Sequence, residues 1–119
     1  MKLEPGEINI ICSDVHRSLH FYGDTLGFLP TLDAEGFYHL RAGAAQYLLL
    51  PTARRRPPPG STPEFSMDLV VDNLREAYAY FQAHGVVFAQ DWRDGAAMFA
   101  IRDPDGLPWE IIQRRNGAI

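Results

Sequence analysis

The sequence lacks the features that mark several classes of protein. Its 119 residues include a single cysteine, Cys12, so no disulfide can form within the chain. No apolar run approaches the roughly 18 residues that a membrane span requires. The amino-terminal MKLEPGE has no apolar stretch typical of a signal peptide. These absences predict a cytoplasmic protein in which Cys12, within the apolar run INIIC, is a buried thiol.

Positive charge is also scarce. The chain has 11 Lys and Arg against 15 Asp and Glu, a formal net charge of −4, which argues against nucleic acid as the main partner. The one basic run, RRR at 54–56, is followed by PPPG, and this composition is typical of an extended linker. GxGxxG, P-loop, CxxC, GxSxG and Ser-His-Asp patterns are all missing, so nothing indicates a dinucleotide, a nucleotide or a serine nucleophile.

What the sequence does contain is an internal repeat. INIICSDVHRSLHFYGDTLGF in the first half matches MDLVVDNLREAYAYFQAHGVVF in the second. Placing Asp14 over Asn73 aligns Phe21 with Tyr80, and a one-residue gap then aligns Gly27 with Gly85. Each half is therefore predicted to run strand, helix and three further strands.

Apolar side chains at helical spacing mark both helices. In the first half the stripe consists of Val15, Leu19, Tyr22 and Leu26. Ser13 or Asp14 can cap its start, and Gly27 suits the left-handed residue beyond its end. In the second half the stripe consists of Leu74, Ala77, Tyr78 and Phe81. Asn73 can cap that helix, and Gly85 can end it.

The other segments read as strands separated by Gly- and Asp-rich turns, at 28–32, 37–41, 46–50, 87–90, 97–102 and 109–113. The prediction is an α+β fold forming one domain over residues 1–119. It has a first βαβββ module at 6–50, a linker at 51–64 and a second module at 65–114.

The segments INIICSDVHRSLHFYGDTLGF, DLVVDNLREAYAYFQAHGV and FAIRDPDGLPWEIIQ resemble the vicinal oxygen chelate superfamily. This superfamily includes glyoxalase I, bleomycin-resistance proteins, fosfomycin-resistance enzymes and extradiol dioxygenases. The resemblance implies paired βαβββ modules whose strands form an open, curled mixed sheet around a central cavity. It also implies a homodimer. In metal-using members, four strand positions, usually His or Glu, hold one divalent cation.

Carried over position by position, the resemblance places Glu7 first, Tyr47 or Leu48 second, Ser66 third and Glu110 fourth. None of these residues is a histidine, on which Zn, Ni and Fe(II) sites of this kind depend. The implied conclusion is that no cofactor is needed. The alternative is a weak site for Mg or Mn held by Glu7 and Glu110.

Strand alternation would place further polar groups beside these two glutamates. The predicted ligand-binding residues are Glu7, Asn9, Tyr47, Ser66, Asp68, Trp92 and Glu110. Carboxylates that share a cavity repel one another, which favours a neutral-to-cationic organic ligand. The aromatic residues available for stacking are Trp92, Phe99, Phe37 and Trp109. The alternative for Glu110 is a strand carboxylate hydrogen-bonded within the fold.

His39 is the histidine with the clearest functional potential. It lies mid-strand in FYHLR and could enter the cavity as an acid, a base or a hydrogen-bond partner, or lie on an exposed strand face. The leading hypothesis is a metal-independent protein of the bleomycin-resistance type that sequesters a small molecule. The second is a lyase, isomerase or dioxygenase that uses a carboxylate metal site, or Glu110 or His39 as a base. The third is a non-catalytic partner or regulatory domain.

Overall fold

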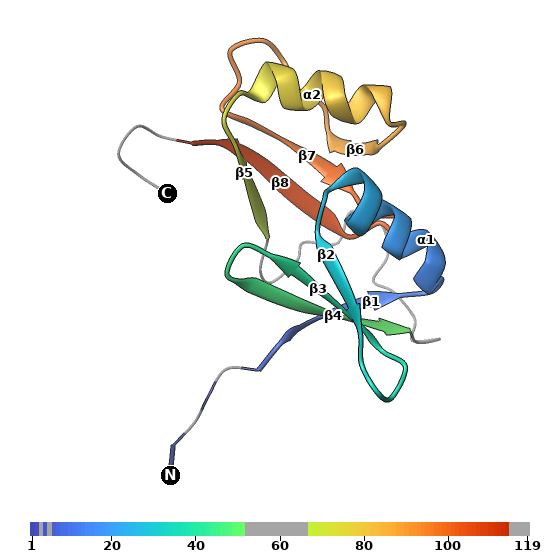
Figure 1. The fold of residues 1–119 in the computed structure, drawn as a ribbon. Helices are drawn as coiled ribbons and strands as arrows, with labels where there is room; N and C mark the ends of the chain where they lie inside the picture. The colour runs from blue at the N-terminus through green and yellow to red at the C-terminus, as the bar shows by residue number, and fades with distance from the viewer. Residues whose placement is uncertain (3, 5, 52–66, 115–119) are drawn as a thin grey trace. The chain divides into compact units, whose positions relative to one another are not determined.

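The computed structural model describes residues 1–114 apart from 3, 5 and 52–66. It divides into two compact units, Met1–Arg56 and Pro57–Ile119. Each unit contains one βαβββ module (Figure 1), which confirms the predicted α+β fold built from two like modules. The predicted linker, apart from Pro51, lies outside the described residues.

The first unit forms a four-stranded mixed sheet of order β1-β4-β3-β2. Its elements are β1 (Ile8–Cys12), α1 (Val15–Leu19), the π-helical η1 (His20–Thr25), β2 (Leu29–Leu32), β3 (Tyr38–Ala42) and β4 (Ala45–Pro51). Strand β1 runs parallel to β4, whereas the β2–β3 and β3–β4 pairs are antiparallel. This topology follows from the sequence, because the helix returns the chain to the far edge of the sheet and two tight turns then complete it.

The second unit repeats this order as β5-β8-β7-β6. Its elements are β5 (Asp68–Val71), α2 (Leu74–Ala83), β6 (Val87–Gln90), β7 (Met98–Arg102) and β8 (Pro108–Gln113). Strand β5 is parallel to β8, and the other two pairs are antiparallel. Among the described residues, no helix has the length and apolar character needed to cross a membrane.

The predicted single helix over 15–26 is wrong in its second half. The α-helical hydrogen bonding ends at Leu19, and η1 continues with wider turns in which Leu26 N–H donates to Phe21 O at 2.9 Å. The wider turns rotate the later residues about the axis. Of the predicted stripe, Tyr22 is buried and Val15, Leu19 and Leu26 are half-buried. The other buried side chains of this segment are Ser18, Phe21 and Thr25.

The predicted helix ends are confirmed. Asp14 Oδ1 accepts the Arg17 N–H at 3.1 Å, and Asn73 Oδ1 accepts the Glu76 N–H at 2.9 Å. Both side chains satisfy N–H groups that have no partner within the helix. Gly85 follows α2 with φ of +69°, a conformation that costs glycine little.

Each sheet buries the face that packs against the helix of its own unit. In the first unit, Tyr22 contacts Phe28 at 5.7 Å between ring centroids, and Phe28 stacks on Tyr47 at 5.8 Å. In the second, Phe81 of α2 meets Phe99 at 6.1 Å. We call the opposite surface of each sheet its far face, because it is turned away from that unit's helix.

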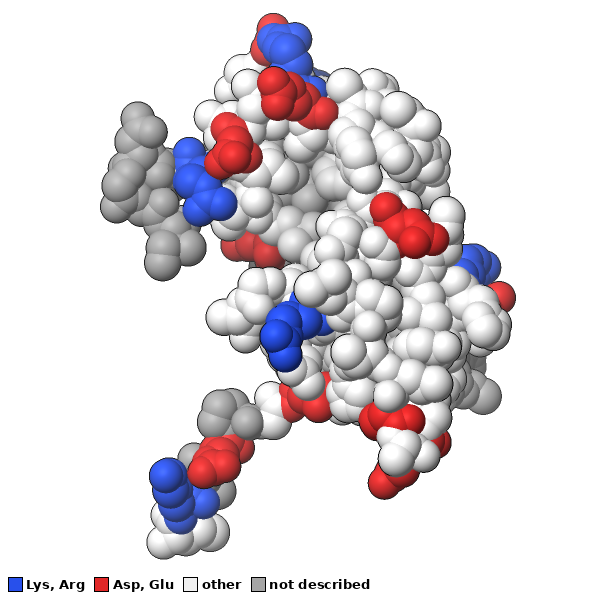
Figure 2. All heavy atoms as spheres, viewed as in Figure 1, with Lys and Arg blue, Asp and Glu red and all other residues white. Residues whose placement is uncertain are grey.

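Charge is dispersed on the surface of the described residues. Figure 2 shows one side of the molecule, on which blue Lys and Arg side chains lie scattered among red Asp and Glu side chains. The described residues on this side form no basic patch of the kind that binds the phosphates of nucleic acids. This agrees with the acidic balance of the sequence.

Replacing Gly85 by alanine tests the requirement for a left-handed residue after α2. An added Cβ meets nothing within 4 Å, so the cost is conformational. It should lower the free energy of unfolding by about 1 kcal/mol. Urea denaturation measures the change. Gly85→Asn is the matched control, because asparagine adopts this conformation more readily and should lose less. Equal stability of the wild type and Gly85→Ala would contradict the assignment.

Candidate functional site

The far face of the second sheet brings two carboxylates together. Asp68 of β5 is the register partner of Glu110 of β8, and Glu110 in turn pairs with Ala100 of β7. Because direct register partners point to the same side of a sheet, all three side chains lie on the far face. The next row along is Val70, Ile112 and Met98. The polar pair is thus bordered by apolar side chains, as the alternation predicts.

A tight turn built on Asp103 fixes the register that places Glu110 there. Asp103 is 4% exposed, and its Oδ1 accepts the N–H groups of Asp105 at 2.9 Å and Leu107 at 2.8 Å. Gly106, with φ of +90°, closes the turn by donating its N–H to Asp103 O at 2.9 Å. A slip of one residue would move Glu110 into the apolar core, so this turn determines the site.

The neighbouring Asp68 changes the acidity of Glu110. Hydrogen bonding to the Asp68 carboxyl raises the pKa of Glu110 above its ordinary value, and desolvation and charge repulsion add to this effect. Glu110 therefore holds its proton more tightly than an isolated glutamate does. A cation placed beside them would remove the repulsion and favour full ionisation of Glu110.

In the first unit, His39 lies between two carboxylates. Its Nδ1 is 2.7 Å from Glu7 Oε2, and its Nε2 is 2.7 Å from Asp33 Oδ2. The His39 side chain is 20% exposed, against 33% for Glu7 and 34% for Asp33. These hydrogen bonds, that to Asp33 first, raise the pKa of His39, and the bond to His39 lowers the pKa of Asp33. Protonated His39 donates both N–H groups, so it has no free lone pair with which to act as a base.

Asp33 is the member of this cluster that the sequence analysis missed. Its Oδ1 accepts the N–H groups of Glu35 at 2.8 Å and Phe37 at 3.0 Å, so it shapes the β2–β3 turn as Asp103 shapes the β7–β8 turn. The likeness of DAEG to DPDG was the available signal. It indicates an Asp-centred turn in both halves. Because Oδ1 of Asp33 accepts both N–H groups of the turn, its Oδ2 is able to contact His39.

The structure distinguishes between Tyr47 and Leu48. Leu48 is the register partner of both Asn9 and His39, which places it on the far face of the first sheet. Tyr47 is 8% exposed and packs on the helix side, where burial raises the pKa of its hydroxyl. The position that the family resemblance assigns to a second metal ligand is therefore held by Leu48, a side chain without a donor atom.

Two of the aromatic residues predicted to stack on a ligand belong to the core instead. Phe99 and Trp109 are each 0% exposed. Their strand positions point to the helix side, where Phe99 contacts Phe81 and Tyr78. Phe37 immediately precedes β3 and is half-buried. Trp92, in the loop between β6 and β7, is the predicted stacking residue that lines a groove.

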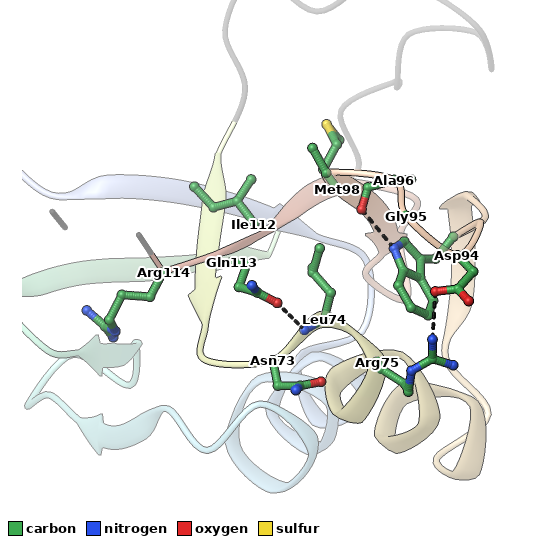
Figure 3. Close-up of a pocket in the computed structure, with 12 residues that line it drawn as sticks. Asn73, Leu74, Arg75, Asp94, Gly95, Ala96, Met98, Ile112, Gln113 and Arg114 are labelled. Atoms are coloured by element: carbon green, nitrogen blue, oxygen red, sulfur yellow. Dashed lines mark hydrogen bonds and ion pairs between the residues drawn. The ribbon is translucent and has the colours of Figure 1, made fainter. Parts of the chain in front are cut away.

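This groove has a volume of about 850 Å³ and lies within the second unit (Figure 3). It is bounded by the start of α2, the 91–97 loop, the start of β7 and the end of β8. The indole N–H of Trp92 donates to Ala96 O at 3.1 Å. Met98 and Ile112, from the row next to Glu110, line the same groove. The groove therefore connects an aromatic side chain with the far-face row that borders the carboxylate pair.

The side chains at the four family positions fit a transition-metal site poorly. Glu7 and Glu110 offer oxygen only, Leu48 offers nothing, and Ser66 lies outside the described residues. His39 cannot supply the missing imidazole, since both its nitrogens are engaged by carboxylates. In the part of the chain that the structure describes, no three His, Cys, Asp or Glu side chains are grouped so as to hold a metal ion.

Comparison with known proteins identifies relatives across almost the whole chain. Residues 5–111 match the family described as the Glyoxalase/Bleomycin resistance protein/Dioxygenase superfamily. No curated protein matches.

Solved structures with the same fold include a superfamily member from Sphaerobacter thermophilus, which is 23% identical with a TM-score of 0.69 and covers 93% of this chain and 98% of its own. A lactoylglutathione lyase from Agrobacterium tumefaciens is 20% identical at a TM-score of 0.65 and covers 92% of each chain. TnmS3, an antibiotic binding protein from Streptomyces, is 19% identical at 0.67 and covers 97% of this chain and 100% of its own.

The His39 cluster predicts a pH-dependent contribution to stability. Because the pKa of His39 is raised above 6.5, its contribution is complete below pH 6.5 and is lost as the pH rises through the folded-state value. The lowered pKa of Asp33 makes its contribution complete above pH 3.8 and lost in stronger acid. Urea denaturation from pH 4 to pH 9 should show that the wild type has a higher free energy of unfolding than His39→Gln at low pH, and that this difference shrinks above pH 6.5. A difference independent of pH would contradict this account.

The carboxylate pair predicts that Asp68 controls the acidity of Glu110. Replacing Asp68 by asparagine removes the carboxyl–carboxyl hydrogen bond and the repulsion, so the pKa of Glu110 should fall toward its ordinary value. Carbon-13 NMR titration of the Glu110 side-chain carboxyl measures this directly. Asp72→Asn, at an exposed site next to the same strand, is the control and should leave Glu110 unchanged. An unaltered Glu110 titration in Asp68→Asn would show that the two groups do not interact.

Proposed function

The chain belongs to the glyoxalase/bleomycin resistance protein/dioxygenase superfamily, and we propose that within it this protein is a metal-independent binder that sequesters a neutral-to-cationic organic molecule. The observation that carries the proposal is the Asp68–Glu110 pair on the far face of the second sheet. A cationic group beside the pair gains attraction from both carboxylates and relieves their mutual repulsion.

The surroundings of the pair suit an organic ligand. Met98 and Ile112 offer apolar contact in the adjacent row, and Trp92 lies at the groove that they line. Small-molecule sites commonly combine a mainly apolar wall with a few placed polar groups. The two arginines of the groove add little net charge, because Arg75 pairs with Asp94 at 2.6 Å and Arg114 with Asp72 at 3.0 Å. Neither of these two arginines therefore cancels the negative charge of the Asp68–Glu110 pair.

The comparisons add support of a general kind. A protein of the same fold is an antibiotic binding protein, so the fold is known to serve small-molecule binding. In the first unit, Glu7 and Asp33 engage both ring nitrogens of His39, which disfavours His39 as a catalytic base. Both points favour binding over chemistry on the ligand.

The alternative is a lyase, isomerase or dioxygenase with a carboxylate metal site. Its support is that a protein of the same fold is a lactoylglutathione lyase, and that paired carboxylates also suit a hard cation such as Mg or Mn. Glu110, with its raised pKa, would then be the candidate base. A third possibility is a non-catalytic regulatory domain. For all three candidate functions, we propose a cytoplasmic homodimer that binds no nucleic acid.

Metal analysis separates the two main proposals. We expect purified, tag-free protein to contain no stoichiometric metal and to bind neither Zn nor Mn at micromolar concentrations, as measured by elemental analysis and calorimetry. Glu110→Gln should behave the same way.

If the wild type instead holds one metal per chain and Glu110→Gln loses it, the binding proposal fails and the enzyme alternative replaces it. Glu35→Gln, in the exposed β2–β3 turn, is the matched control for the loss of one carboxylate. Metal that is lost equally from both variants would point to nonspecific binding, and the metal-independent proposal would stand.

A further inference from the structure

We propose that Trp92 and Asp94 form a recognition site for planar cations such as amidinium and guanidinium groups. In the free protein the guanidinium group of Arg75 occupies this site. This rests on the proposed function, because it names the ligand group that the groove of the second unit would bind. Arg75 thus acts as an internal competitor that an incoming cation must displace.

The contacts of Arg75 show what the site selects. Its guanidinium carbon lies 5.3 Å from the centroid of the Trp92 ring, within the range of a cation–π interaction. Its Nη2 lies 2.6 Å from Asp94 Oδ1 (Figure 3). One planar cation is therefore held by an aromatic ring and by a carboxylate. A ligand with the same group would find the same two partners.

Arg75 is placed so that it can be displaced. The side chains of Arg75 and Asp94 are 67% and 76% exposed, and ion pairs so open to water are weak. The arginine comes from the first turn of α2, whereas its two partners belong to the 91–97 loop. Rotation of one flexible side chain would vacate the site without moving the helix.

The loop that carries the site does not depend on Arg75 for its shape. The Tyr78 hydroxyl donates to Asp91 Oδ1 at 2.6 Å, and the same oxygen accepts the Trp92 N–H at 3.0 Å. The Trp92 indole donates to Ala96 O, and Tyr78 packs against the Trp92 ring at 5.6 Å. Removing the Arg75 guanidinium should therefore leave the Trp92 ring and the Asp94 carboxylate in place.

The test is a titration with benzamidine, an aromatic amidinium. Binding is followed by the NMR signal of the Trp92 indole N–H, with the signal of fully buried Trp109 as an internal reference. We expect Arg75→Ala to bind benzamidine roughly four- to twenty-fivefold more tightly than the wild type. This range follows because an exposed cation–π contact and an exposed ion pair each contribute a factor of about two to five.

Controls separate displacement from mere enlargement of the groove. Arg114→Ala removes the other arginine of the groove and should give no gain. The double variant Arg75→Ala/Asp94→Asn should lose the gain, and neutral benzamide should bind the wild type and Arg75→Ala alike. If Arg75→Ala lowers the melting temperature, Arg75→Gln replaces it. An unchanged affinity for benzamidine, or an equal gain for benzamide, would overturn the proposal.

The carboxylate pair is tested separately. Glu110→Gln removes a carboxylate of the proposed ligand site, so it should weaken benzamidine binding to the wild type and to Arg75→Ala by the same factor and leave the ratio between them unchanged. If the gain persists in Glu110→Gln while the metal analysis favours an enzyme, the planar-cation site stands and the metal-independent proposal falls. If the gain is absent in both backgrounds, the planar-cation site falls and the role of Asp68 and Glu110 is unaffected.

Discussion

Both sheets depend on an aspartate that organises a hairpin turn from within. Asp33 and Asp103 each accept two N–H groups of the turn with one carboxylate oxygen. Each turn fixes the register of the strand that follows it, and a register error of one residue would exchange the two faces of a strand. The positions of His39 and Glu110 on the far faces are consequences of these two turns.

The far faces collect charge that the cores could not hold. Isolated carboxylates are costly to desolvate, and each half relieves that cost differently. In the first unit, Glu7 and Asp33 both hydrogen-bond to His39, whose raised pKa favours its cationic form beside the two carboxylates. In the second, no ion pair joins Asp68 or Glu110 to a cation among the described residues, and hydrogen bonding to Asp68, followed by desolvation and repulsion, raises the pKa of Glu110. This difference makes the second unit the better candidate for binding a cationic ligand.

Much of the fold could be predicted from the sequence, because periodicity and turn residues act locally. The repeat, both helix caps and the face occupied by Glu110 all follow from short-range patterns. What could not be predicted depends on contacts distant in sequence or on helix geometry. The π-helical turns after Leu19 leave no periodic signal, and the choice between Tyr47 and Leu48 required the observed register. The hydrogen bond between Glu7 and His39 joins residues that are 32 positions apart in the sequence.

The most direct test of the central claim compares benzylamine with its neutral isostere benzyl alcohol at pH 7. Calorimetry would measure binding to the wild type and to the double variant Asp68→Asn/Glu110→Gln. We predict that the wild type prefers the cation and that the double variant loses this preference while keeping its melting temperature. Equal binding of both compounds to the wild type, or a preference for the cation that survives in the double variant, would contradict the role given to the carboxylate pair.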